Sequence, residues 1–420
     1  MNEIIAKINS KLDIVELVSE YLPLSKKGKN FWGVCPFHLD SNPSMSVSPE
    51  KQIYKCFSCG ASGGIVNFYA DINKLSFNKA ISELAVKAGF EVSNIEEKKY
   101  SDSDFKIINL LKDATQYMQY TLETTSDKKV RDYLEKRQLT QRVIERFKIG
   151  LSPEKGLKEF LLKKSHDEAT MINSSLVNSM GSDFFRGRLM FPISNEFGDI
   201  VGFSARTLNE GEVKYINSSE NSIFHKSGVL YNYSNAQDVA IREKQIYICE
   251  GQMDVIALDK IGISNAVAVM GTALTQNHLK LLSGFQIILN FDNDKAGISA
   301  TLKSIKLLHD NNFKVLVVDN NSGKDADSIL IEQGKEKLIE TLENKLTSFE
   351  WIYIKHKEKY SKNDPEQIKE MVTSFSKYLK SATSIEKDFY INKISEDYSL
   401  SRETVANIFG VSIKFERKCQ

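Results

Sequence analysis

Four potential metal ligands fall within 25 residues near the N-terminus. Cys35-Pro36-Phe37-His38 is followed, after 17 residues, by Cys56-Phe57-Ser58-Cys59, which gives the pattern C-x2-H…C-x2-C. Each pair can supply two ligands from one tight turn, and two such turns complete a tetrahedron. Because four protein ligands leave no open coordination position, we predict one structural Zn²⁺. Its predicted ligands are Cys35, His38, Cys56 and Cys59.

Aromatic and lysine residues alternate around these ligands. Aromatic faces stack on bases and lysines meet phosphates, which is how proteins bind unpaired nucleic-acid strands. The same aromatic residues can instead fill the core of a small ribbon, so both interpretations stay open. The residues concerned are Phe31, Trp32, Tyr54 and Phe57, with Lys26, Lys27, Lys29, Lys51 and Lys55.

Acidic residues follow three apolar runs in the second half of the chain. The runs are Ile246–Cys249, Gln286–Phe291 and Phe313–Val318. They alternate with helical patterns, which predicts a parallel sheet built from βαβ units. The loops at the carboxyl ends of such strands converge on one crevice. We therefore expect the following carboxylates to meet at one edge of the sheet: Glu250, Asp254, Asp292, Asp294, Asp325 and Asp327.

Clustered carboxylates repel one another unless cations neutralise them. Oxygen ligands without histidine or cysteine favour Mg²⁺ or Mn²⁺. Two such ions are the usual device for nucleotidyl transfer. Each acid alone could be a helix cap or a solvated turn, but three acidic loops within one run of βα units favour a catalytic metal site.

Length and charge suggest several domains. A chain of 420 residues exceeds one ordinary core. Residues 128–188 carry 14 Lys/Arg against 8 Asp/Glu, whereas residues 245–330 carry 7 against 9. A basic region before an acidic one suits an enzyme that holds a polyanion beside a metal site, although ordinary solvated surface would look the same.

The patterns divide the chain into four parts. We expect a zinc ribbon, a mixed α/β basic part with helices near 105–123, 127–137 and 140–147, a parallel-sheet part and a helical part. A polar linker is expected at 93–104, and Asp13 is expected to cap a helix. The proposed domains are 1–95, 105–242, 243–330 and 335–420.

Nothing in the sequence suggests a membrane protein. No apolar run approaches the roughly 18 residues of a membrane span. The first ten residues carry Glu3 and Lys7 and do not resemble a signal peptide. We therefore expect a cytoplasmic protein without a membrane partner.

Together these stretches resemble the bacterial replicative DNA primases of the DnaG type along nearly the whole chain. The zinc part matches at 13–15, 27–38, 43–44, 54–60 and 63–64, and the basic part at 186–193, 214–218 and 224–226. The acidic part looks like a Toprim domain, with matches at 250–254, 271–275, 291–297 and 325–328.

The resemblance implies an enzyme that makes short RNA primers on single-stranded DNA from ribonucleoside triphosphates, acting as a monomer. Glu250, Asp292 and Asp294 would be the main ligands of catalytic Mg²⁺ or Mn²⁺, with the other three carboxylates supporting. A basic cleft for template and nucleotide would comprise Arg137, Arg206, Lys214 and Lys226.

The chain departs from the family pattern in a few places. Asn293 and Ala326 stand where glycine and proline are usual, and Ser204-Ala205 replace two glycines. Family members usually carry a further domain that binds the replicative helicase, and this sequence stops at Gln420 without one. We therefore expect weak priming that gains little from the helicase. The last helical segment is expected to pack on the core through Phe389, Tyr390, Ile391 and Ile394.

Two other classes of function compete. A Toprim nuclease or topoisomerase would share the acidic loops, but a topoisomerase also needs a tyrosine nucleophile in a strand-passage domain, which we do not recognise. A non-catalytic zinc-ribbon DNA-binding protein would explain residues 1–95 but not the carboxylates.

Overall fold

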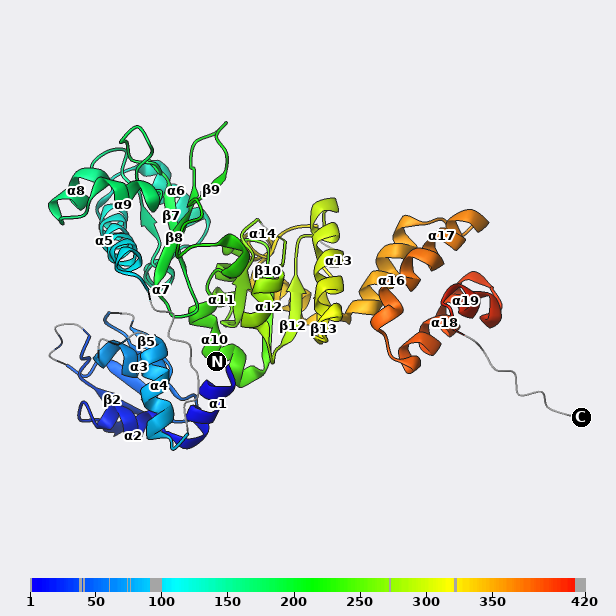
Figure 1. Ribbon diagram of the computed structural model, residues 1–420, viewed down its shortest axis with the longest axis horizontal. Coiled ribbons are helices and arrows are strands. Elements are labelled where there is room, and N and C mark those ends of the chain that lie inside the picture. Colours follow the sequence, from blue (N-terminus) through cyan, green and yellow to red (C-terminus); the bar gives the residue numbers. More distant parts are fainter. Residues whose placement is uncertain are drawn as a thin grey trace, which may run out of the picture.

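The computed structural model shows three sheets and a group of C-terminal helices arranged along an elongated molecule (Figure 1). The structure describes residues 2–37, 40, 42–59, 61–73, 75, 77–90, 100–271, 273–320 and 323–411. Most of the predicted linker at 93–104 lies outside these ranges. The predicted class, a zinc ribbon followed by mixed and parallel α/β parts and helices, is confirmed.

The N-terminal part is a small antiparallel sheet flanked by helices. Asp13 caps the second helix as predicted, because its carboxylate accepts hydrogen bonds from the backbone N–H groups of Val15 and Glu16. Tyr54 and Phe68 lie in its core. The elements are α1 (Asn2–Lys11), α2 (Ile14–Ser19), β1 (Ser25–Lys27), β2 (Asn30–Gly33), β3 (Met45–Ser48), β4 (Ile53–Cys56), β5 (Ser62–Gly63), α3 (Ile65–Asn73) and α4 (Phe77–Lys87).

The second part packs a long helix against a four-stranded antiparallel sheet of order β6-β7-β8-β9. The three helices expected here are present. The elements are α5 (Asp102–Thr124), α6 (Lys128–Lys136), α7 (Gln141–Phe147), β6 (Gly150–Leu151), α8 (Leu157–Lys163), α9 (Glu168–Asn173), β7 (Leu189–Ser194), β8 (Ile200–Arg206), β9 (Tyr215–Asn217), the 3-10 helix η1 (Lys226–Gly228) and α10 (Tyr233–Glu243).

The third part is the predicted parallel sheet, which lies in the middle of Figure 1. Its order is β11-β10-β12-β13-β14, with β10, β11, β12 and β13 parallel. The elements are β10 (Gln245–Cys249), α11 (Gln252–Lys260), β11 (Ala266–Ala268), α12 (Gln276–Leu282), β12 (Gln286–Asn290), α13 (Lys295–Asp310), β13 (Val315–Val318), α14 (Ala326–Gln333), α15 (Lys335–Glu343) and β14 (Lys345–Thr347).

The C-terminal part is helical and extends to one end of the molecule (Figure 1). Its elements are α16 (Ser348–Lys359), α17 (Pro365–Ser376), η2 (Tyr378–Ser381), α18 (Ser384–Tyr398) and α19 (Arg402–Ile408).

Two predictions about this end were wrong. Residues after Lys335 are not entirely helical, because β14 pairs antiparallel with β13 and extends the central sheet. Phe389 is 55% exposed, whereas Tyr390, Ile391 and Ile394 are buried as predicted.

The N-terminal part contacts helix α10 directly. The backbone N–H of Gly64 donates a 2.9 Å hydrogen bond to Asp238 of α10, and Arg242 donates to the backbone oxygen of Lys51. Within the described ranges, no helix is long and apolar enough to cross a membrane.

Candidate functional site

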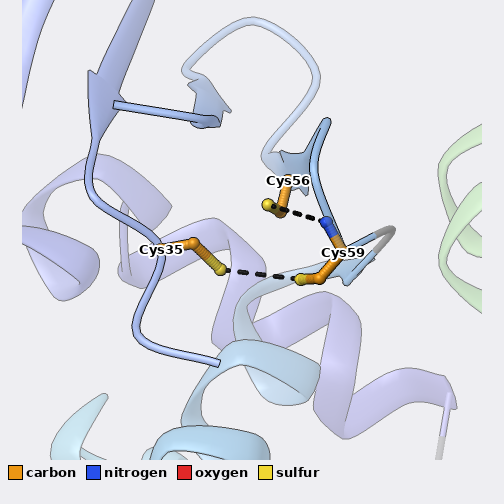
Figure 2. Close-up of side chains that lie close together, drawn as sticks. All are labelled: Cys35, Cys56 and Cys59. Carbon is orange, nitrogen blue, oxygen red and sulfur yellow. Dashed lines mark hydrogen bonds between the residues drawn. The ribbon is translucent and has the colours of Figure 1, made fainter. Parts of the chain in front are cut away.

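Three of the four predicted zinc ligands lie together at one end of the N-terminal sheet (Figure 2). Met45 of β3 pairs with both Gly33 and Cys56, which brings the turn after β2 beside the turn after β4. The Sγ atoms of Cys35 and Cys59 are 3.8 Å apart, and all three sulfurs lie within 4.8 Å of one another. The fourth predicted ligand, His38, lies outside the described residues.

The surroundings of the sulfurs fit a metal-bound thiolate cluster. Burial raises the pKa of the Cys56 thiol, but hydrogen bonds from the backbone of Cys59 and from the Ser44 hydroxyl outweigh it, so the pKa falls below its usual value. Burial raises the pKa of Cys35 to about 12 and also raises the pKa of Cys59. Three thiolates at this separation need a cation, and Zn²⁺ matches their number and softness.

The aromatic residues around the cluster divide between core and surface. Tyr54 is fully buried, where it fills the core. Trp32 and Phe57 instead stack with ring centroids 5.6 Å apart, and Phe57 is 64% exposed. Lys55 lies over the Phe57 ring at 5.5 Å. The exposed Phe57, the half-buried Trp32 and the lysine together have the composition of a single-strand stacking surface.

The predicted carboxylates gather at the carboxyl edge of the parallel sheet. Glu250 follows β10 directly, and its Oε1 accepts a 3.1 Å hydrogen bond from the backbone N–H of Asp292, which lies beyond β12. Asp254, on the first turn of α11, accepts a 3.4 Å hydrogen bond from the backbone of Asp327 on α14. These two contacts join the three loops of the site across 42 and 73 residues.

Mutual repulsion is evident in the pKa values of these carboxyls. Burial, together with the neighbouring charges of Asp292 and Asp294, raises the pKa of Glu250. Burial and Asp325 raise the pKa of Asp254 well above its usual value, and both also raise the pKa of Asp292. Within the described ranges, no three carboxylates approach as closely as the three sulfurs. A divalent cation would offset this repulsion.

Two of the carboxylates also cap helices. Asp294 Oδ1 accepts from the backbone N–H of Gly297 at 2.7 Å, and Asp325 Oδ1 accepts from Ser328 at 2.6 Å. Each cap uses one oxygen and fixes the side chain at a helix start. Asn293 does not have a positive φ, so the glycine usual in the family is not needed for backbone conformation here.

Gly297 is required by the close approach of α13 to the site. A Cβ atom at this position would lie 2.0 Å from the backbone oxygen of Asp292 and 2.9 Å from Oε1 of Glu250. Glycine therefore lets the helix start press directly against two of the predicted metal ligands.

Asp327 is an ion-pair partner as well as a member of the acidic cluster. Its side chain is 2% exposed, and its Oδ2 pairs with the guanidinium of Arg137. Lys260 Nζ lies 4.0 Å from its Oδ1 and donates to the backbone oxygen of Arg137 at 2.5 Å. Lys260 was not predicted from the sequence, because nothing local in a lysine at the end of a helix indicates this role.

The remaining predicted basic residues lie on the antiparallel sheet and its loops. Arg206, at the end of β8, lies between the rings of Tyr133 and Tyr215, at 4.7 and 5.2 Å from their centroids, and donates to the Tyr215 hydroxyl at 2.9 Å. Burial and neighbouring carboxylates raise the pKa of Asp292, and the charge of Lys214 offsets part of this rise, so this lysine lies near the acidic edge. Lys226 is positioned through its backbone oxygen, which lies 3.1 Å from Nε2 of His278.

Comparisons with known proteins agree with this arrangement. The family model "CHC2 zinc finger" matches residues 1–100, "DNA primase catalytic core, N-terminal domain" matches 117–237, and "Toprim-like" matches 247–330. The DNA primase of Clostridium acetobutylicum is 32% identical, with 98% of this chain and 70% of the relative covered. That of Thermotoga maritima is 33% identical, with coverages of 97% and 74%.

Solved structures of DNA primases are also similar to this chain. The zinc-binding and RNA polymerase domains of the Aquifex aeolicus primase match with a TM-score of 0.65 and 28% identity, covering 96% of this chain and 98% of that one. A DnaG primase catalytic domain bound to single-stranded DNA matches with a TM-score of 0.60 and 26% identity, covering 70% and 99%. With the zinc ribbon, the basic part and the acidic edge all present in one chain, this protein belongs to the DnaG-type DNA primase family.

Proposed function

We propose that this RNA-polymerising nucleotidyltransferase joins ribonucleotides at the carboxylate edge of the central sheet while the zinc ribbon and the basic part hold the template. The observation that carries the proposal is the hydrogen-bonded convergence of Glu250, Asp254, Asp292 and Asp327 from three loops of one sheet edge. Single-stranded DNA and ribonucleoside triphosphates are the proposed ligands, and the replicative helicase is a proposed partner.

In this proposal, each of the four parts of the chain has its own role. Residues 1–95 form the template-binding zinc ribbon, and 105–242 form the basic part. Residues 243–330 carry the catalytic carboxylates, and 335–420 close the core.

Divalent ions, Mg²⁺ or Mn²⁺, fit the proposed catalytic site. Glu250, Asp292 and Asp294 would be the main ligands. Burial, followed by the charges of neighbouring carboxylates, raises the pKa values of Glu250 and Asp292, which supports a site where a bound cation would be stabilising. Asp254, Asp325 and Asp327 would support them. Such ions, when bound, lower the pKa of the attacking hydroxyl and neutralise charge on the phosphate.

Arg206, Lys214 and Lys226 are proposed to hold the template strand and the triphosphate. Arg206 is well suited, because Tyr133 and Tyr215 hold its guanidinium in one place. Arg137 is proposed to contribute as well, although its pairing with Asp327 leaves only its other donors for a phosphate.

The proposed Zn²⁺ site comprises Cys35, Cys56 and Cys59 with His38. The metal would hold the turns after β2 and β4 together, and with them the surface of Trp32 and Phe57. Its role is structural, because four protein ligands leave no position for substrate.

The nature of the product tests the proposed function. The purified chain would be incubated with single-stranded template, Mg²⁺ and labelled ribonucleotides, and the products would be separated by size. Short RNA that requires both template and Mg²⁺ is the expected result. Cut or relaxed DNA would support a Toprim nuclease or topoisomerase instead, and retention of the strand without chemistry would support a binding protein.

A further inference from the structure

A polar groove of ≈ 880 Å³ lies at the edge of the central sheet opposite the carboxylates. Lys244 precedes β10, Gln286 begins β12 and Lys314 precedes β13, and all three line the groove. Glu250 and Asp292 follow the same strands at their other ends. Because a strand of five residues spans about 16 Å, the groove is a separate place on the molecule.

Three lysines from different elements surround this groove. Lys244 ends α10, Lys280 lies on the last turn of α12, and Lys314 follows the turn after α13. Among the described residues that line the groove, none is an aspartate or a glutamate. All three side chains are exposed, and none forms an ion pair within the described ranges. The three lysines therefore give the groove lining a local charge of about +3.

The backbone of this edge is held firmly. The N–H of Gln286 donates to the carbonyl oxygen of Lys244 at 2.9 Å, and the N–H of Ile287 donates to that of Lys314 at 2.9 Å. These bonds continue the parallel pairing of β10 with β12 and of β12 with β13. Lys244 and Lys314 thus project from fixed positions on either side of β12.

The rest of the lining is suited to sugars and phosphates. Besides the lysines it is mainly amide and hydroxyl side chains, including Gln276, Asn277 and Asn312. Lysine, asparagine, glutamine and serine are the side chains that commonly contact nucleic-acid backbones. Phe285 lines the groove but is only 6% exposed, so it offers little surface for stacking on a base.

We propose that this groove binds the phosphate backbone of single-stranded nucleic acid, independently of sequence, as a second contact for the template strand. The inference goes beyond the proposed function, which needs only the carboxylate edge and the surfaces beside it. A strand must pass from one edge of the sheet to the other to occupy both places. At the stacked spacing of about 3.4 Å per nucleotide, this path corresponds to roughly five nucleotides beyond the catalytic edge.

Binding of short and long single strands over a series of salt concentrations tests the proposal. Wild-type protein would be compared, by fluorescence anisotropy, with a groove variant and a control variant of equal charge change. The groove variant is Lys244→Gln/Lys280→Gln/Lys314→Gln, and the control, on exposed lysines of the C-terminal helices, is Lys369→Gln/Lys377→Gln/Lys380→Gln.

For long strands, the slope of log affinity against log salt should be shallower by about 2 in the groove variant than in wild type. Each phosphate contact to a single strand contributes about 0.7 to this slope, and the variant removes three lysines. Its binding of short strands, its melting temperature and its primer synthesis on a short template should match those of wild type. The control variant should keep the wild-type slope.

The proposal would be overturned if the groove and control variants had equal slopes of log affinity against log salt. It would also be overturned if the groove variant lost the same amount of slope with short strands as with long ones. Tight binding of a labelled nucleoside triphosphate that only the groove variant loses would also overturn it, in favour of a mononucleotide site. Wild-type priming on the short template tests the proposed function separately. If that priming failed while the groove variant still lost salt dependence with long strands only, the groove proposal would be supported and the proposed function would be wrong.

Discussion

Replacing Gly297 with alanine perturbs the catalytic edge without touching a charged group. The added Cβ would lie 2.0 Å from the backbone oxygen of Asp292, closer than the 3.0 Å below which real Cβ contacts essentially do not occur. Asp292 or the start of α13 must therefore move by at least about 1 Å. The second contact, 2.9 Å to Glu250 Oε1, pushes on another proposed ligand at the same time.

The size of this displacement determines the expected loss of primer synthesis. A misplacement of about 1 Å at a reacting centre can cost on the order of 100-fold in rate. Overpacking of a tight site costs roughly 1–3 kcal/mol of stability. Gly297→Ala should therefore lower primer synthesis about 100-fold while the protein stays folded and binds single-stranded DNA nearly as well as wild type.

Three measurements check this prediction: primer yield with labelled ribonucleotides, anisotropy with single-stranded DNA, and urea unfolding. Gly228→Ala is the matched control, because a Cβ there meets nothing within 4 Å and the backbone φ is not positive. Near wild-type primer yield from Gly297→Ala would refute the reasoning, since it would show that the positions of Asp292 and Glu250 do not govern the reaction.

Three other predictions concern the metals and the buried ion pair. Cys56→Ser should release the zinc and unfold the N-terminal part, because metal binding supplies folding free energy; full zinc content by metal analysis would show that the ligand set is wrong. Arg137→Ala should cost roughly 2–4 kcal/mol in urea unfolding, because it leaves Asp327 buried with only Lys260 nearby. The double variant Arg137→Ala/Asp327→Ala should lose less unfolding free energy than Arg137→Ala alone. An equal or larger loss would show that Arg137 and Asp327 are not coupled. Because the pKa values of Glu250 and Asp292 are raised in the folded chain, these carboxyls contribute stability at low pH that is lost as pH rises. Stabilisation by added Mg²⁺, measured by unfolding, should therefore increase with pH through the raised pKa values, and a pH-independent effect would contradict binding at this site.

Local patterns predicted the scaffold of the site well. The apolar runs that become β10 and β12 end directly before Glu250 and Asp292, and Asp325 follows the run of β13 after a polar loop. The pattern therefore predicts both the parallel sheet and the edge where its carboxylates meet. Asp13 was predictable as a cap because its role depends only on the next three residues. Such features depend on near neighbours in the sequence.

Contacts between residues far apart in the chain could not be predicted from the sequence. Arg137 and Asp327 are 190 residues apart, and each was assigned a different role because neither position reveals the other. The two tyrosines that enclose Arg206 come from α6 and β9, and only the folded chain brings them together. β14 was missed because three residues between helices carry too little pattern, and pairing with β13 determines their conformation.

In the proposed function, the carboxylate edge performs the chemistry and does not bind the template. The most direct test is Asp292→Ala, assayed for primer synthesis and for single-strand binding on the same preparation. Asp310→Ala is the control, because Asp310 is an exposed acid that pairs with Lys306 at the far end of the neighbouring helix α13. We expect no detectable primer from Asp292→Ala, with template affinity within about twofold of wild type, and normal priming from Asp310→Ala. Primer synthesis by Asp292→Ala at near the wild-type rate would contradict the proposed function.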